Sequence, residues 1–248
     1  MESYESLAFS YDVLTQDVGY ERRADFVEKL FTRAKISVHT VLDLACGTGT
    51  MTKLFTERGY ELIGVDISEE MLMEAREKTQ NSKGVPPLFL HQSMPELDLY
   101  GTVDACICCL DSLNYLTNPH DVRRTFERLH LFIAPGGVLI FDVHAPKKME
   151  ALDSQVFLDE RDNLYCVWRT EYRKRAKTLD YYVDIFRATG KDVWERSFEE
   201  HHQRAYMASE LTAWLEAAGF TAIRTHGDGK LRSPNEGEGR IYFSCIRK

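Results

Sequence analysis

Hydrophobic and polar positions follow two different periodicities along the chain. Between about residues 38 and 143, short apolar runs are separated by segments whose apolar residues recur at helical spacing, as at Val122, Phe126 and Leu129. Strands separated by helices favour parallel pairing with right-handed crossovers, and runs with few polar residues suit strands buried on both faces. The pattern predicts five strands, at residues 41–45, 62–65, 88–91, 103–110 and 138–143.

The rhythm changes after residue 145. The apolar segments there are rich in aromatic residues, alternate in part with polar ones and have no helix-sized stretch between them, which is typical of antiparallel hairpins. They lie at residues 156–157, 165–172, 181–186 and 193–206. A helical pattern returns at residues 211–218, and two last strands are predicted at 221–225 and 241–246.

Composition narrows the function classes. The formal net charge is −8, so we expect no binding to the phosphates of nucleic acid. A group of basic residues falls around a predicted hairpin turn and is interpreted as a solvated face: Arg169, Arg173, Lys174, Arg175 and Lys177. Without a basic leader before Arg22 or an unbroken apolar stretch, we expect a cytoplasmic protein that does not enter membranes. Of the six cysteines, Cys106, Cys108 and Cys109 lie in one apolar run that is expected to be a buried strand, no second cysteine cluster supplies further ligands, and we expect no metal site.

The candidate chemistry begins with the segment Asp43-Leu44-Ala45-Cys46-Gly47-Thr48-Gly49, which joins the first strand to the first helix. Glycine lets the backbone turn sharply and approach a ligand closely. A second acid, Asp66, ends the next strand and could accept both ribose hydroxyls of a nucleoside. Dinucleotide enzymes need a third glycine where Thr52 stands, and Asp43 would repel a pyrophosphate. The segment therefore favours a cofactor with an adenosine half and a cationic amino-acid half.

These residues resemble the class I S-adenosylmethionine (SAM)-dependent methyltransferases over residues 38–145, with weaker support from 206 to 248. Alanine replaces the first glycine of the family's motif, and Ser93 stands where the family usually has an acid near the adenine. The resemblance implies a Rossmann-like α/β fold with a seven-stranded, mostly parallel sheet and helices on both faces. The implied cofactor is SAM, held by Tyr11, Asp43, Ala45, Gly47, Gly49, Asp66, Ile67, Met71, Ser93, Met94 and Leu110. For Met71 and its neighbour Leu72, a position in the helix core is favoured over a cofactor contact.

The acceptor side is less specific. The aromatic stretch from Tyr4 to Tyr20, which includes Phe9, is expected to cover the site, with Tyr11-Asp12 over the methionine end of the cofactor. The hairpins resemble the substrate-covering layer of glycine and amino-sugar N-methyltransferases. Since His201 and His202 must point to opposite faces of one strand, we place His202 with Arg204 in the cleft. The expected catalytic residues are His144, Tyr11 and His202, and the expected acceptor contacts are Asp111, Asn114, Tyr115, His144, His202 and Arg204.

The sequence thus predicts three parts: an N-terminal helical cover at 1–37, a SAM-binding domain at 38–145 and 207–248, and an inserted antiparallel lid at 146–206. The predicted activity is methyl transfer to a nitrogen or oxygen of a small polar acceptor. A nicotinamide-dependent oxidoreductase and a non-catalytic SAM-binding protein stay open as alternatives, and so does a homodimer.

Overall fold

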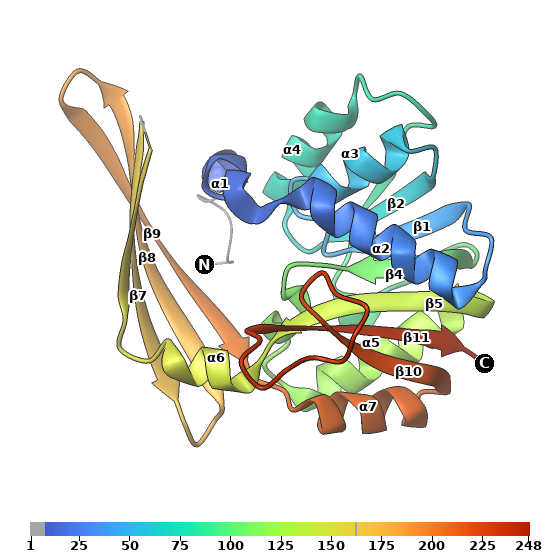
Figure 1. Cartoon of the computed structure of the whole chain (residues 1–248). Helices are drawn as coiled ribbons and strands as arrows, with labels where there is room; N and C mark the ends of the chain where they lie inside the picture. Colours follow the sequence, from blue (N-terminus) through green and yellow to red (C-terminus); the bar gives the residue numbers. More distant parts are fainter. Residues whose placement is uncertain (1–7, 162) are drawn as a thin grey trace.

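A seven-stranded sheet forms the centre of the molecule in the computed structural model, which describes residues 8–161 and 163–248 (Figure 1). Its order is β10-β11-β5-β4-β1-β2-β3, and only β11 runs against its neighbours. The strands are β1 (Thr40–Leu44), β2 (Glu61–Asp66), β3 (Leu88–His91), β4 (Val103–Cys108), β5 (Ile133–His144), β10 (Phe220–Gly227) and β11 (Arg240–Arg247). The mostly parallel Rossmann-like sheet is therefore confirmed. Its strand order reverses between β1 and β4, which is where open α/β sheets bind ligands.

Helices cover both faces of this sheet. One buried cluster joins the sheet to α5 (Pro119–Phe132) and α7 (Ala208–Ala217), and the other joins it to α2 (Tyr20–Ala34) and α3 (Thr50–Glu57). A further helix, α4 (Glu69–Thr79), follows β2. Its N-terminus is capped by Ser68, whose Oγ accepts the backbone N–H of Met71 at 3.2 Å. This cap fixes the start of α4 directly after β2 and so beside the predicted cofactor site.

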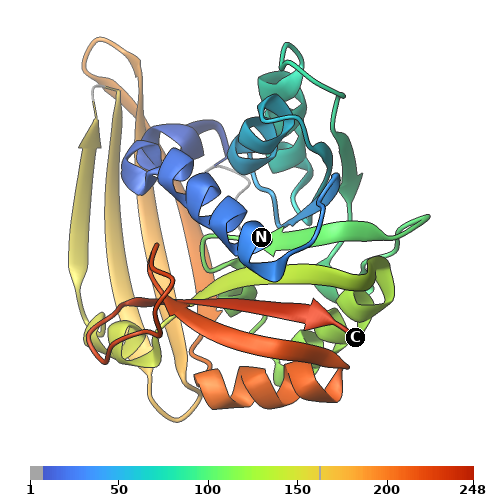
Figure 2. The ribbon, with the colours of Figure 1, turned by 45° about the vertical axis from the view of Figure 1, so that its right-hand side comes forward.

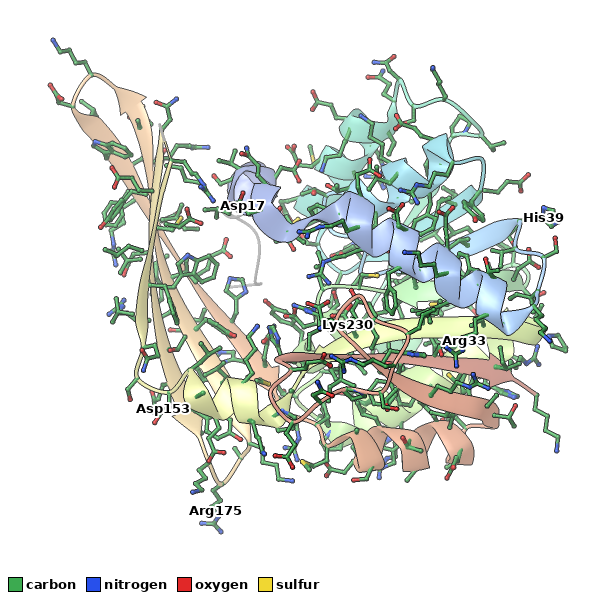
Figure 3. The ribbon with its side chains drawn as sticks, viewed as in Figure 1. Asp17, Arg33, His39, Asp153, Arg175 and Lys230 are labelled. Carbon is green, nitrogen blue, oxygen red and sulfur yellow. The ribbon has the colours of Figure 1, made fainter. Side chains whose placement is uncertain are left out.

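A second sheet stands apart from the first and lies within the predicted lid. Its four antiparallel strands follow chain order: β6 (Val156–Arg161), β7 (Leu164–Arg173), β8 (Thr178–Gly190) and β9 (Val193–Arg204). The short helix α6 (Pro146–Ala151) leads into it from β5. Arg175 lies at the tip of the β7–β8 hairpin (Figure 3). At the same end of the sheet, Arg173 forms an ion pair of 2.7 Å with Asp180, so the basic cluster belongs to a solvated hairpin.

The N-terminal helix α1 (Ala8–Leu14) and the single turn η1 (Gln16–Val18) lie between the two sheets (Figure 2). Tyr11, Val13 and Leu14 pack on the lid sheet against a buried cluster that includes Val183 and Ile185. Both elements fall within residues 1–37, the predicted N-terminal cover, and that division of the chain stays a prediction. The expected contribution of Tyr4, and that of the Phe9 side chain, lies outside the described residues. No helix within the described ranges is long and apolar enough to cross a membrane.

Candidate functional site

The loop after β1 adopts the backbone that its sequence predicts. Ala45, Gly47 and Gly49 have φ of 58°, 54° and 73°. A Cβ on Gly47 would meet no atom within 4 Å, so this glycine faces open space. A Cβ on Gly49 would lie 2.8 Å from the Cβ of Ala75 on α4. Gly49 therefore allows helix α4 to approach the loop, and its contact with a cofactor stays a prediction.

The cavity in front of Gly47 is about 300 Å³ and ends at Asp66. The Asp66 carboxylate accepts the backbone N–H of Gly47 at 2.8 Å and of Ser68 at 3.0 Å, so it ties the loop to the end of β2. Burial raises the pKa of Asp66 although these bonds lower it. Other predicted contacts that line this cavity are Ile67, Met71, Ser93 and Met94, and Gln92, Pro95 and Leu116 join them.

A narrower pocket lies beside it, around Asp43. The Asp43 side chain is only 2% exposed and accepts the Thr52 hydroxyl at 2.6 Å. Burial, helped by the charge of Asp66, raises the pKa of Asp43 to about 7. A buried carboxylate with one hydroxyl partner is stabilised when a cation lies next to it. Thr50 and Cys109 also line this pocket, so it is bounded by residues that follow β1 and β4.

The N-terminal cover is fastened to this loop by a polar cluster, which we call the Asp12 latch: Asp12, Thr48, Thr50 and Lys78. Thr48 donates its hydroxyl to Asp12 at 2.6 Å. The Lys78 ammonium from α4 lies 2.6 Å from Asp12 Oδ2 and donates to Thr48 at 2.8 Å and to Thr50 at 2.7 Å. One lysine thus holds α1 against the N-terminus of α3, and it keeps Tyr11 at the wall of all three cavities.

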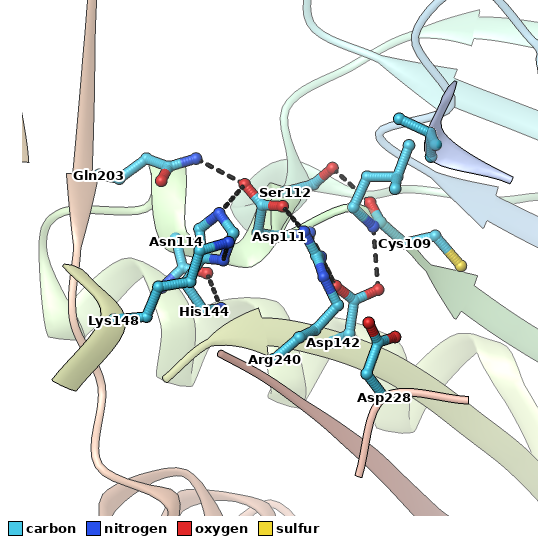
Figure 4. A network of polar contacts seen from close by, with 12 residues as sticks. Cys109, Asp111, Ser112, Asn114, Asp142, His144, Lys148, Gln203, Asp228 and Arg240 are labelled. Atoms are coloured by element: carbon cyan, nitrogen blue, oxygen red, sulfur yellow. Dashed lines mark hydrogen bonds and ion pairs between the residues drawn. The ribbon is translucent and has the colours of Figure 1, made fainter. Parts of the chain in front are cut away.

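The end of β4 is shaped by two consecutive left-handed residues, Leu110 and Asp111, with φ of 61° and 54°. Such a conformation is uncommon outside glycine and needs support from its surroundings. Asp142 on β5 supplies it, because its carboxylate accepts the backbone N–H groups of Leu110 at 2.9 Å and Asp111 at 3.0 Å (Figure 4). Asp142 in turn pairs with Arg240, which reaches across from β11.

Asp111 is thereby turned toward the lid. Its carboxylate lies 2.6 Å from an Arg240 nitrogen and 3.3 Å from Nε2 of His144, and it accepts the Gln203 amide at 2.8 Å (Figure 4). Burial alone would raise the pKa of Asp111, but the charges of His144 and Arg240 hold it well below its usual range. Asp111 therefore stays ionised in a site that is closed to most of the solvent.

A third cavity, of about 240 Å³, opens between Asp111 and the lid; we call it the acceptor cavity. It shares Tyr11 and Tyr115 with the wall of the 300 Å³ cavity and Leu110 with the Asp43 pocket, so the three spaces meet at the ends of β1 and β4. Its lining is aromatic and polar: Tyr11, Thr15, Val18, Leu110, Asp111, Tyr115, Trp168, Tyr181, His201, Gln203 and Arg240.

Two of the predicted acceptor contacts face the other way. His202 is 2.7 Å from Asp180 on the outer face of the lid sheet, and Arg204 donates to the carbonyl of Ala176. Because side chains alternate along a strand, it is His201 and Gln203 that face the acceptor cavity. The prediction that the even-numbered side chains of β9 face the cleft was wrong. His202 is therefore withdrawn as a catalytic residue, and His202 and Arg204 are withdrawn as acceptor contacts.

Two further residues lie behind the cavity wall. Asn114 is fully buried. Its side chain donates to the carbonyl of Arg204 at 2.7 Å and accepts the backbone N–H of His144 at 3.0 Å. The expected contact with the methyl acceptor is therefore wrong, and Asn114 instead links β5 to the end of β9. His144 lines no cavity at this site and contacts Asp111 instead. Four residues of the cavity wall were not predicted. Trp168, Tyr181 and His201 could have been grouped from the alternation of the lid strands, whereas no local signal marks Arg240.

The site fits a cofactor made of a nucleoside and a cationic amino acid. Gly47 leaves space where any side chain would intrude, an acid stands at one end of the larger cavity, and a buried acid with room for a cation stands in the narrower pocket. The Asp66 end would hold the ribose, the apolar groups of Ile67, Met71 and Met94 would pack on the adenine, and Asp43 would face the amino-acid half.

Known proteins match both the sequence and the fold. A methyltransferase domain model matches residues 41–137. YqeM of Bacillus subtilis (strain 168), which carries a methyltransferase name, is 32% identical over 98% of this chain and 96% of its own length. A dTDP-3-amino-3,4,6-trideoxy-alpha-D-glucopyranose N,N-dimethyltransferase of Streptomyces venezuelae is 28% identical over 53% of this chain and 54% of its own.

The likeness extends to solved structures. The crystal structure of an S-adenosylmethionine-dependent methyltransferase from Clostridium acetobutylicum ATCC 824 has a TM-score of 0.88 and 26% identity, and the match covers 98% of each chain. The sequence relatives, the fold and the cavities at the ends of β1, β2 and β4 agree. They decide against the nicotinamide and non-catalytic alternatives, and the chain belongs to the SAM-dependent methyltransferases.

Proposed function

We propose that this methyltransferase acts on an amine of a small polar molecule that binds in the acceptor cavity. The observation that carries the proposal is the composition of that cavity. Rings from α1, η3 (Ser112–Tyr115), β7 and β8, namely Tyr11, Tyr115, Trp168 and Tyr181, surround a space that is also bounded by the Asp111 carboxylate. Aromatic faces and a carboxylate both attract a cation, and an amine enters as one.

The charge state of the wall supports this preference. Asp111 stays ionised because His144 and Arg240 lower its pKa against the effect of burial. Burial raises the pKa of Tyr11 and Tyr181, so both phenols stay neutral and compete with neither the ammonium nor its carboxylate partner.

The size of the cavity favours a metabolite over a polymer. A space of about 240 Å³ bounded by the lid strands, α1 and the residues that follow β4 suits a small molecule, whereas a nucleic acid needs a long, basic groove. The amino-sugar N,N-dimethyltransferase of Streptomyces venezuelae, by its name, acts on a small amine, which is consistent with this proposal. A cytoplasmic location and a homodimer remain predictions.

The chain's own residues would contribute positioning more than chemistry. SAM supplies a methyl group already activated by its sulfonium, so the protein has mainly to align the acceptor nitrogen with it. We assign the alignment to Asp111 and Tyr11, and we assign to His144 the role of holding Asp111 in place, since it contacts that carboxylate and lines no cavity at the site. On this proposal His144 is a positioning residue.

Matched pairs of acceptors test the proposal. Glycine would be compared with glycolate, and 3-amino-3,6-dideoxy-D-glucose with 6-deoxy-D-glucose, by the release of S-adenosylhomocysteine and the mass of the product. We expect methyl transfer to one or both amines and none to the matched hydroxyl compounds. Faster transfer to a hydroxyl member of a pair, or transfer to neither amine, would contradict the assignment of an amine acceptor.

A further inference from the structure

Two titratable residues on the inner face of β9 form a buried pair that the functions discussed above do not use. Glu199 and His201 are two positions apart, so both side chains lie on the same face of the strand. They are 4% and 1% exposed, and Nε2 of His201 is 3.3 Å from Oε2 of Glu199. Burying a carboxylate and an imidazole away from water lowers the stability of the fold unless the two groups balance each other's charge or serve a function.

The His201 ring is part of the wall of the acceptor cavity. It stacks on Trp168 with ring centroids 6.5 Å apart and meets the edge of Tyr115 at 6.0 Å. Tyr115 also lines the 300 Å³ cavity next to the cofactor residues. His201 is therefore separated by a single side chain from the space assigned to SAM, and its ring orientation is fixed by two aromatic neighbours.

An amine acceptor needs a group that takes a proton. Amines are mostly protonated at neutral pH, and an ammonium nitrogen has no lone pair with which to attack a methyl group. We propose that His201 accepts the proton of the bound ammonium and that Glu199 positions the imidazole and balances its charge. This inference rests on the proposed amine acceptor.

The step balances as follows. One N–H bond of the ammonium breaks and the proton forms a new N–H bond on the His201 ring, which leaves a neutral amine. The nitrogen lone pair then bonds to the methyl carbon while the carbon–sulfur bond breaks, and that electron pair stays on sulfur as a neutral thioether. The methylated nitrogen carries the positive charge, and His201 returns its proton to solvent when the product leaves.

Other titratable groups around the cavity are less suited to this task. Asp111 is surrounded by Arg240, His144 and Gln203, and its low pKa makes it a poor proton acceptor. Tyr11 and Tyr181 have pKa values raised by burial, so their phenols hold their protons. Among the residues that the structure describes, Tyr115 from η3 and Arg240 from β11 also line the cavity that His201 faces.

The test compares three variants of β9. His201→Gln and Glu199→Gln alter its inner face, and His202→Gln, the matched control, alters its outer face. His202 is the neighbouring histidine, and its ring points to the outer face of the lid. The kcat for the preferred amine of the pairs above, either glycine or 3-amino-3,6-dideoxy-D-glucose, would be measured from pH 6.5 to 9.5. Calorimetry with SAM would report whether each variant keeps a folded cofactor site.

We expect His201→Gln to lower kcat at pH 7 by about 100-fold, the lower range for loss of a general base, with an unchanged Kd for SAM. The deficit should shrink by at least tenfold at pH 9.5, because free amine becomes abundant and no longer needs a base. Glu199→Gln should lower kcat by about tenfold, and His202→Gln should match the wild type.

Other results would overturn the inference. Wild-type kcat in His201→Gln at pH 7 would show that no proton passes through this residue. A deficit that stays constant between pH 7 and 9.5 would show a purely structural role. If His201→Gln no longer binds SAM, the pH comparison is made with Glu199→Gln instead. A loss of kcat in Glu199→Gln that is the same at pH 7 and pH 9.5 would then overturn the inference. A wild-type enzyme that methylates neither amine would overturn the proposed function, and this inference with it.

Discussion

Asp43 is held in the folded protein at a free-energy cost, and its removal provides a quantitative test of the site. The side chain is 2% exposed, and burial raises its pKa from the usual 3.8 to about 7. An acid whose pKa is higher in the folded chain than in the unfolded chain makes the protein less stable as pH rises between those two values, and the loss is complete above the higher one. The Asp43→Asn variant abolishes this titration.

The magnitude follows from the two pKa values. Each unit of difference corresponds to 1.36 kcal/mol, so the raised pKa of Asp43 lowers the stability of the cofactor-free protein by about 1.5 kcal/mol at pH 5, where only the unfolded chain is ionised, and by about 4 kcal/mol at pH 8, where the folded chain is ionised too. Asparagine can still accept the Thr52 hydroxyl, although the bond is weaker without the charge, by about 1 kcal/mol. We therefore expect Asp43→Asn to be more stable than the wild type at pH 8, by about 3 kcal/mol, and nearly equal to it at pH 5.

Urea denaturation of the cofactor-free protein at pH 5 and pH 8 would measure this difference. All other titrations are common to both proteins, so the change in their stability difference, about 2.5 kcal/mol between the two pH values, isolates Asp43. A difference that does not change with pH would refute the reasoning. Calorimetry gives an independent check: SAM affinity should rise from pH 6 to 8 in the wild type, where Asp43 becomes ionised, and should be weaker and insensitive to pH in the variant.

Three further changes test other parts of the site. Asp66→Ala should weaken SAM binding at least tenfold in a folded protein, since charge-assisted hydrogen bonds are lost; calorimetry showing an unchanged Kd would remove Asp66 from the ribose site. Lys78→Met opens the Asp12 latch and should raise the dissociation rate of SAM about tenfold in stopped-flow displacement, and a wild-type rate would mean that the latch does not retain the cofactor. Arg240→Met leaves two buried aspartates without their shared cation and should lower the free energy of unfolding by about 3–5 kcal/mol; a loss below 1 kcal/mol in chemical denaturation would contradict the importance of this pairing.

The cofactor half of the site could be predicted because its signal is local. The turn from β1 to α3 needs positive φ at Gly47, and a parallel strand must end at Asp66 beside it, so spacing along the chain fixes positions in space. The acceptor half could not be predicted in this way. His202 and Arg204 were placed in the cleft although they lie on the outer face, because a period of two defines two faces and does not say which one is covered.

The sequence by itself determined the order of strands and helices, the loop that faces the cofactor and the change to antiparallel pairing after residue 145, since these depend on hydrophobic period and on residues close together in the chain. Tertiary structure alone decided which side of β9 faces inward, through the packing of α1 on the lid sheet. It also decided that Arg240 from β11 joins Asp111 from the end of β4, 129 positions away. Such pairings depend on how whole elements pack, and no short segment of sequence carries that information.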